Sequence, residues 1–312
     1  MYTERGSIMN KDNKGYLYGF IAYIAWGILP FYWKILQHID SKEVLAYRIL
    51  FSSLFIFLAL IALGKIKETS FEIKDILHNK TKLMYMSLGA LFISMNWLLF
   101  ITSVSSGNVI DASLGYYMNP LVNVIIAVII LNEKITKPAI IACIFAVIGV
   151  IILSISTGKF PWTAILLAVT FSLYGLTKKK VDISSSTSLF METFILAPFA
   201  LCYLAFYSST GFISFDLGII LTIIGTGIVT VIPLLLFSIA AKRVSYIALG
   251  FIQYVSPTLM LISAVFLFKE IFSIAQLSGF ISIWIGIAIF ICGNISKNVS
   301  KEGSEVETLV EN

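Results

Sequence analysis

Two groups of polar and aromatic residues flank prolines inside long apolar stretches, and they are the residues best suited to bind a small molecule. A proline inside a helix removes one backbone hydrogen bond and leaves a carbonyl oxygen free one turn earlier. That oxygen, with nearby amide, hydroxyl and aromatic groups, would form a reversible binding site for a small amphipathic substrate. The predicted cavity residues are Tyr116, Tyr117, Asn119, Pro120 and Asn123 in the first group and Gln253, Tyr254, Ser256, Pro257 and Thr258 in the second. The alternative is a pair of kinks that let helices pack, with Asn and Gln bonding across helices.

The two groups occupy equivalent places in an internal repeat. Residues 114–133 read LGYYMNPLVNVIIAVIILNE, and residues 249–270 read LGFIQYVSPTLMLISAVFLFKE. The positions that match are Pro120 with Pro257, Ala127 with Ala264, and Glu133 with Glu270. Long apolar helices seldom share a central proline and a closing acid at matched spacing by chance, so the pattern indicates a duplication. In a membrane, such a duplication is typical of transporters.

Three ionisable residues in or beside the apolar runs are candidates for gating or ion coupling: Arg48, Asp111 and Glu192. Intramembrane charge is costly enough to make a functional role worth testing. Arg48 and Glu192 lie at similar depths but from opposite membrane faces, which argues against a salt bridge between them. We predict that Arg48 lies at the outer mouth and Glu192 at the inner mouth, near Lys178–Lys180. The alternatives are snorkelling to the interface for this pair and helix N-capping for Asp111.

The composition places these residues in a membrane protein. Of 312 residues, 58% are hydrophobic and 12% are charged, and the mean hydropathy is +0.94. A water-soluble fold cannot bury that much apolar surface. Apolar runs of roughly 18–24 residues, each long enough to cross the ~30 Å hydrocarbon core as a helix, recur along the chain. The predicted spans are residues 16–36, 44–64, 83–103, 109–131, 138–156, 161–177, 187–207, 216–240, 246–268 and 274–293.

We therefore predict an all-α membrane protein of ten transmembrane helices, arranged as two repeats of five. The first repeat covers residues 15–156 and the second covers 159–293, with a loose polar segment at 1–14 and a disordered tail at 294–312. Because each half holds an odd number of spans, the second half must enter the membrane from the opposite side. The repeats are thus expected to be inverted, with the substrate site near the middle of the bilayer.

The distribution of basic residues predicts which way the chain faces. With ten spans both termini share a side, and most of the 22 lysines and arginines fall on that side. The exceptions are Arg48 inside a span and Lys34, Lys42, Lys159 and Lys269 on the other face. By the positive-inside rule, both termini are expected in the cytoplasm. The net charge of +5 follows from this topology and requires no nucleic-acid partner.

Several other residues have local interpretations. The longest hydrophilic loop, 65–82, is expected to be a solvated cytoplasmic face that meets anionic head groups. Glu133 and Glu270 each close a helix, where the helix dipole disfavours an anion, so we expect either a role in orienting the next loop or a role in gating. Asn96 is expected to bond to a neighbouring helix, and Trp33 to lie in the interfacial aromatic belt.

The sequence argues against several other functions. It lacks the Gly-rich Lys-Ser/Thr pattern of nucleotide-binding loops, so ATP is not expected to drive the protein, whereas proton coupling through Glu192 or Asp111 is a hypothesis. Cys143, Cys202 and Cys292 lie in apolar runs without metal-ligand or redox spacing, so no metal or cofactor is expected. An enzyme is disfavoured because no catalytic constellation occurs at membrane depth. A membrane sensor or scaffold without transport is the alternative, but it does not explain the paired prolines.

Several long stretches resemble the RarD group of the EamA family, within the drug/metabolite transporter superfamily. They are AYIAWGILPFYWKIL at 22–36, EVLAYRILFSSL at 43–54, NWLLFI at 96–101, DASLGYYMNPLVNV at 111–124, SLFMETFILAP at 188–198 and LGFIQYVSPTLM at 249–260. The resemblance implies a ten-helix permease of two inverted EamA repeats in a bacterial plasma membrane, with efflux of a small metabolite or drug as its expected activity. The group is usually labelled as chloramphenicol-sensitive or chloramphenicol-resistance permeases, a label that does not fix the physiological substrate.

Overall fold

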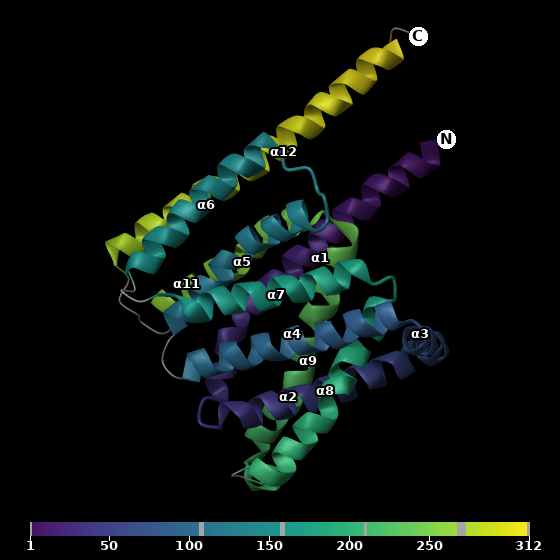
Figure 1. The fold of residues 1–312 in the computed structure, drawn as a ribbon, viewed down its shortest axis with the longest axis vertical. Coiled ribbons are helices and arrows are strands. Elements are labelled where there is room, and N and C mark those ends of the chain that lie inside the picture. Colours follow the sequence, from purple (N-terminus) through teal and green to yellow (C-terminus); the bar gives the residue numbers. More distant parts are fainter. Residues whose placement is uncertain (1, 106–108, 157–159, 209–210, 267–272, 311–312) are drawn as a thin grey trace.

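The computed structural model of the chain is a bundle of helices (Figure 1). It describes the backbone of residues 2–105, 109–156, 160–208, 211–266 and 273–310, and the side chains in these ranges except at 2–13, 104, 105, 109–113, 213, 263–266 and 294–310. The elements are, in chain order, α1 (Tyr2–Ile35), α2 (Ser41–Ala62), α3 (Ile66–His78), α4 (Lys80–Ser105), α5 (Val109–Ile129), α6 (Lys137–Ser156), α7 (Trp162–Lys180), α8 (Ser185–Tyr207), η1 (Phe212–Ser214), α9 (Leu217–Arg243), α10 (Tyr246–Gln253), α11 (Val255–Phe266) and α12 (Ile274–Val310).

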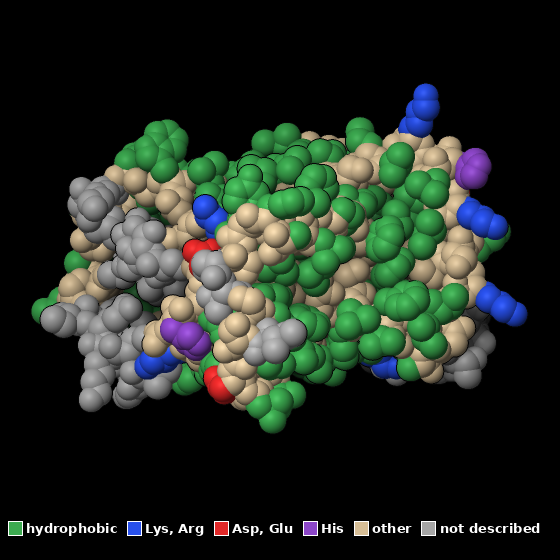
Figure 2. All heavy atoms as spheres, turned by 90° about the horizontal axis from the view of Figure 1, so that it is seen from below, with side chains coloured by type: hydrophobic (Ala, Val, Ile, Leu, Met, Phe, Trp, Pro, Cys, Tyr) green, Lys and Arg blue, Asp and Glu red, His purple; other side chains and the backbone are tan. Residues whose placement is uncertain are grey.

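The outer surface of the bundle is suited to lipid. Within the described residues, six helices are long and apolar enough to cross a membrane: α2, α4, α6, α8, α9 and the part of α12 at Ile274–Gly293. Two shorter apolar stretches lie at Leu114–Ile129 and Tyr246–Ile262. The face in Figure 2 carries hydrophobic side chains across its middle, while its charged side chains gather toward the two ends. Large exposed apolar side chains such as Phe199 and Leu221 would be costly in water, so the chain is a multi-pass membrane protein.

Helices occupy the stretches that the sequence predicts as spans, but the two prolines act differently. The stretch at 246–268 is divided at Tyr254, where α10 ends and α11 follows. Pro257 accounts for this break, because it has no N–H to donate to the carbonyl of Gln253. The α5 helix, in contrast, continues through Pro120 without such a break.

The stretch at 65–82 is not an irregular loop, because most of it forms the amphipathic helix α3, although most of its charged side chains are exposed as the sequence predicts. Its inward-facing positions Thr69, Ile73 and Ile76 are spaced at helical intervals, which places them on one face. Ile76 is completely buried in a cluster of side chains from α4, α8 and the α7–α8 loop. The many charged residues of α3 hide this short apolar stripe in the sequence.

The terminal segments also differ from the expectation of loose chain. The backbone of α1 begins at Tyr2 and that of α12 extends to Val310, so residues 1–14 and 294–312 largely continue the end helices. Lys and Glu are good helix formers and these segments contain no proline, so nothing in them stops a helix that has already begun. Both chain ends lie on the same side of the bundle (Figure 1).

The two ends of the bundle are distinguished by their charge. We call the end that holds α3 and Lys178–Lys180 the basic end, and the end that holds the α1–α2 turn at residues 36–40 the opposite end. Between the two ends, α1 packs on α9 and α11, α4 packs on α7, and α5 packs on α7 and α10. The α6 and α12 helices form a close pair, since a Cβ at Gly149 would lie 2.6 Å from the Gly279 carbonyl oxygen.

Candidate functional site

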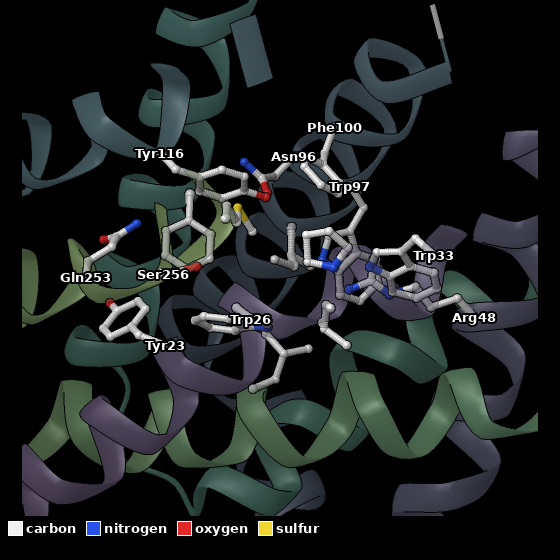
Figure 3. A pocket seen from close by; sticks show the side chains of 16 residues that line it. Tyr23, Trp26, Trp33, Arg48, Asn96, Trp97, Phe100, Tyr116, Gln253 and Ser256 are labelled. Carbon is white, nitrogen blue, oxygen red and sulfur yellow. The ribbon is translucent and has the colours of Figure 1, made fainter. Parts of the chain in front are cut away.

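A cavity lies inside the bundle, between helices from both halves of the chain (Figure 3). The space between its lining residues is about 570 Å³, a figure that includes space open to solvent. The lining residues are Tyr23, Trp26, Leu29, Pro30, Trp33, Arg48, Ile93, Asn96, Trp97, Phe100, Tyr116, Phe171, Leu234, Gln253, Ser256 and Met260. The lining is therefore rich in aromatic side chains, with aliphatic residues, a few amide and hydroxyl groups and one charge.

Two helical stripes supply most of the lining. One face of α1 and one face of α4 contribute residues at intervals of three and four, so their side chains point the same way. The stripes are Tyr23, Trp26, Pro30 and Trp33 on α1, and Ile93, Asn96, Trp97 and Phe100 on α4. Asn96 is also fixed to α7, because its Nδ2 donates to the carbonyl oxygen of Leu167 at 2.9 Å and to Oγ1 of Thr170 at 3.1 Å.

Arg48 is the charged residue of the cavity. Asp40 caps the start of α2 by accepting hydrogen bonds from the backbone N–H groups of Lys42 and Glu43, and Arg48 follows two turns later. Its side chain is 5% exposed, and Nε donates to Oγ1 of Thr230 at 2.8 Å. Its Cζ lies over the rings of Trp33 and Trp97, at 4.9 and 4.2 Å from their centroids. These contacts hold the guanidinium inside the protein.

The structure brings three members of the predicted proline groups into the cavity lining: Tyr116, Gln253 and Ser256. Pro120 and Pro257 have no N–H, so the carbonyls of Tyr116 and Gln253, both lining residues, lack the helical hydrogen bond that they would otherwise accept. The two copies also touch each other, because Asn123 Nδ2 donates to Gln253 Oε1 at 3.1 Å.

The other predicted cavity residues lie in helix contacts beside this cavity. Tyr117 and Tyr254 are buried, and their ring centroids are 6.2 Å apart. Thr258 donates to the carbonyl of Tyr254 and accepts from Nε1 of Trp284. The remaining members of this set are Asn119, Pro120, Asn123 and Pro257, none of which is part of the lining. The side chain of Asp111 lies outside the described residues, as does Glu270.

The basic end holds a buried ion pair between Glu192 and Lys178. Glu192 lies as far from the start of α8 as Arg48 lies from the start of α2. Glu192 is 1% exposed, and both of its carboxylate oxygens lie 2.6 Å from Nζ of Lys178. Lys178 also donates to Oγ of Ser188 at 2.8 Å, and the Tyr174 hydroxyl donates to Glu192 at 3.3 Å. The predicted neighbourhood of Glu192 and the basic cluster is present, and it connects α7 to α8 with the pair sealed from water.

A second group of contacts ties the start of α10 to the basic end. Glu133 Oε1 accepts from the backbone N–H of Tyr246 at 2.8 Å, and Oε2 accepts from that of Ile247 at 3.1 Å. Lys179 Nζ lies 3.6 Å from Glu133 and donates to the carbonyl of Val244 at 2.8 Å. The Glu133 carboxylate thus caps the N-terminus of α10, where the helix dipole favours an anion. This contact explains why an acidic residue follows the C-terminus of α5.

The helix α3 is joined to this end by a carboxylate. Glu72 accepts from the backbone N–H and the hydroxyl of Ser184, at 2.7 and 2.6 Å, and Ser184 itself caps α8. Partial burial acts to raise the pKa of Glu72, but the hydrogen bonds from Ser184 and Thr187 outweigh it, so the pKa is lowered. The described residues contain no group of three or more His, Cys, Asp or Glu side chains that could hold a metal.

Comparison with known proteins places this architecture in a family. The model of the EamA-like transporter family matches the chain twice, at residues 13–155 and 160–292. This chain belongs to the EamA-like transporter family. It is 36% identical over 293 residues to the uncharacterized transporter YojE of Bacillus subtilis, covering 93% of this chain and 98% of that protein. It is also 36% identical over 284 residues to the protein RarD of Salmonella typhi, covering 90% and 95%.

A solved crystal structure shows the same EamA fold. That chain is 20% identical, has a TM-score of 0.65, and is matched over 88% of this chain and 96% of its own length. The RarD relatives identify this protein as a RarD-type EamA protein, and its family identifies it as a membrane transporter.

The aromatic half of this EamA cavity is what sequence reasoning missed. Trp33 is predicted in the interfacial belt, but it lines the cavity beside Arg48. The signal that finds it is the spacing on α1, since Tyr23, Trp26 and Trp33 lie on one helical face. The sequence predicts that Glu192 lies near Lys178–Lys180, but it does not single out Lys178 as the lysine that pairs with Glu192.

Proposed function

We propose that this RarD-type protein is a secondary-active permease that moves a small amphipathic metabolite or drug across the bacterial plasma membrane by alternating access, with export as its direction. The observation that carries the proposal is a central cavity lined from both halves of the chain, together with a buried ion pair beyond it at the basic end. A site that is accessible from one end while the other end is sealed is what alternating access requires.

The pattern of helix contacts supports two inverted repeats of five helices and ten membrane crossings. The first half would contain α1, α2, α4, α5 and α6, and the second would contain α7, α8, α9, the broken pair α10 and α11, and α12. In this arrangement α1 corresponds to α7, α2 to α8, α4 to α9, α5 to the pair α10 and α11, and α6 to α12. Replacing each helix by its counterpart turns the α1–α9 contact into the α7–α4 contact and the α5–α7 contact into the α11–α1 contact. All four contacts occur. The contacts α2–α8, α5–α10 and α6–α12 convert into themselves. This is the behaviour expected of a two-fold axis in the membrane plane.

The sidedness of the proposal rests on the charged residues. Most lysines and arginines lie at the basic end, so the positive-inside rule places that end and both termini in the cytoplasm. The cavity, with Trp33 and Arg48 near the opposite end, would then face outward. The Lys178–Glu192 pair would form the closed cytoplasmic gate.

Proton coupling is part of the proposal, with Glu192 as its main candidate and Asp111 as the second. A buried carboxylate that alternates between a lysine partner and a proton can link gate opening to a pH gradient. Neutralising Glu192 or Asp111 should uncouple flux from the gradient. Flux through the unaltered protein that is indifferent to the pH gradient would remove protons as the coupling ion.

Flux measurements on the full-length protein reconstituted in vesicles test the function directly. A panel of amphipathic metabolites should be used, with chloramphenicol included because a Pseudomonas aeruginosa relative, 25% identical, is named chloramphenicol-sensitive protein RarD. We expect saturable flux of at least one compound, accelerated by the same compound on the far side of the membrane. Binding of panel compounds without any flux would instead identify a membrane sensor or scaffold.

A further inference from the structure

We infer that the cavity recognises an organic anion, with the acidic group of the ligand bound by Arg48 and an apolar or aromatic body held by the cavity wall. This inference deepens the proposed function by naming the substrate class, and its meaning for transport rests on that proposal. The binding claim itself depends only on the contacts around Arg48.

The charge of Arg48 has no counter-charge in the described structure. The ion pairs found there are Lys82 with Asp75, Lys178 with Glu192, and Lys179 with Glu133. No Asp or Glu is among the residues that line the cavity. Burying a charge without a partner is costly, and its contacts with Trp33 and Trp97 offset only part of that cost. An anion that enters the cavity would supply the missing charge.

The hydrogen-bonding groups of Arg48 fit this role. A guanidinium carries five N–H donors, and the one hydrogen bond that Arg48 makes in the described structure uses Nε, which donates to Thr230. That bond and the two tryptophan rings fix the orientation of the group. Its terminal nitrogens offer the paired N–H groups that bind a carboxylate or phosphate through two parallel hydrogen bonds.

The rest of the cavity defines the other part of the ligand. In Figure 3, Trp33 and Trp97 lie with Arg48 at one side of the cavity, Tyr23 and Gln253 lie at the other, and Trp26 lies between them. A ligand that reaches from Arg48 into this space would place its body against aromatic rings. Cations would be repelled by Arg48 and would find no carboxylate in the lining, so the same residues also provide selectivity against them.

Calorimetric titration of the purified full-length protein tests this class with matched pairs of probes. The pairs are phenylacetate with phenylacetamide, indole-3-acetate with indole-3-acetamide, and hexanoate with hexanamide, which differ mainly in charge. We expect at least one carboxylate to bind about tenfold or more tightly than its amide, as a charge-assisted hydrogen bond implies. Arg48→Gln should remove that preference and Arg48→Lys should retain part of it. Lys42→Gln, which removes an exposed charge from the same helix, should leave it unchanged.

The outcomes separate this inference from the proposed transport. If no carboxylate binds more tightly than its amide, or if Arg48→Gln keeps the preference, the anion inference is overturned. If vesicles carry neutral amides as fast as carboxylates, the anion inference fails while transport stands. If carboxylates bind through Arg48 but never cross the bilayer, the transport proposal fails and the anion site stands.

Discussion

Arg48 and Glu192 occupy matching places in the two halves of the chain but have opposite surroundings. Arg48 lies seven residues after Ser41, the first residue of α2, and Glu192 lies seven residues after Ser185, the first residue of α8. Both are almost fully buried. Glu192 is neutralised by Lys178, whereas Arg48 faces a cavity and contacts aromatic rings. Equivalent positions in α2 and α8 thus hold a cavity-lining charge in one half and a paired charge in the other, and we propose that the first binds a ligand while the second closes the basic end.

Removing one partner of the closed pair should have the largest effect on stability. Lys178→Ala or Glu192→Ala leaves a buried charge without a partner, which typically costs about 3–5 kcal/mol. Thermal unfolding of the detergent-purified protein measures this loss. The matched control is the double variant Lys178→Met with Glu192→Leu, which should recover most of the lost stability because no charge is left behind. Single variants as stable as the parent would show that the pair does not hold this end together.

The corresponding change at Arg48 should affect binding far more than stability. Arg48→Met removes a charge that has no counter-charge, so we expect the free energy of unfolding to change by no more than about 1 kcal/mol while ligand binding and flux are lost. Thermal unfolding and flux on the same preparation measure both quantities. A destabilisation as large as that of Glu192→Ala would mean that Arg48 is a structural residue and that the two ends are alike.

A substitution at Glu133 tests whether the contact between this carboxylate and the first turn of α10 also stabilises the basic end. Glu133→Gln weakens two charge-assisted hydrogen bonds to the first turn of α10 and the ion pair with Lys179, so a loss of about 1 kcal/mol is expected. Hydrogen exchange should become faster at the backbone amides of Tyr246 and Ile247. Lys134→Gln, which changes an exposed neighbour, serves as the control and should leave that exchange unchanged.

The contact between Glu72 and Ser184 should give the smallest effect, and it should depend on pH. Because the folded-state pKa of Glu72 lies below the ordinary value of 4.5, its stabilisation is fully present above that value and is lost as the pH falls through the lower, folded-state value. Glu72→Gln should therefore lower the melting temperature at neutral pH by the equivalent of less than about 1 kcal/mol, since the carboxylate is partly exposed to solvent. The difference from the parent should vanish in acid. Glu68→Gln, which changes an exposed residue of the same helix, is the matched control and should leave the melting temperature at neutral pH unchanged.

The sequence predicts much of the bundle but less of the site, for a physical reason. Long apolar runs and the positions of Pro257, Arg48 and Glu192 along them are visible without a structure, because bilayer thickness sets the length of a spanning helix. The rotation of each helix is harder to predict, since lipid and neighbouring helices are equally apolar. The sequence therefore did not show that Asn119 is buried outside the cavity lining or that Trp33 faces the cavity. The helix α3 was not predicted from the sequence, because its apolar stripe is short and lies among charged residues.

The most direct test of alternating access is whether the basic end opens at the Lys178–Glu192 pair during transport. Ser188, which contacts Lys178, and Ser256, which lines the cavity, can each be replaced by cysteine in a background without Cys143, Cys202 and Cys292. A membrane-impermeant thiol reagent is then applied to vesicles from each side. We predict that Ser256→Cys reacts from the opposite end at rest. Ser188→Cys should react only from the basic end and only while substrate is moving. A Ser188→Cys variant that stays unreactive during measured flux would contradict alternating access through this pair.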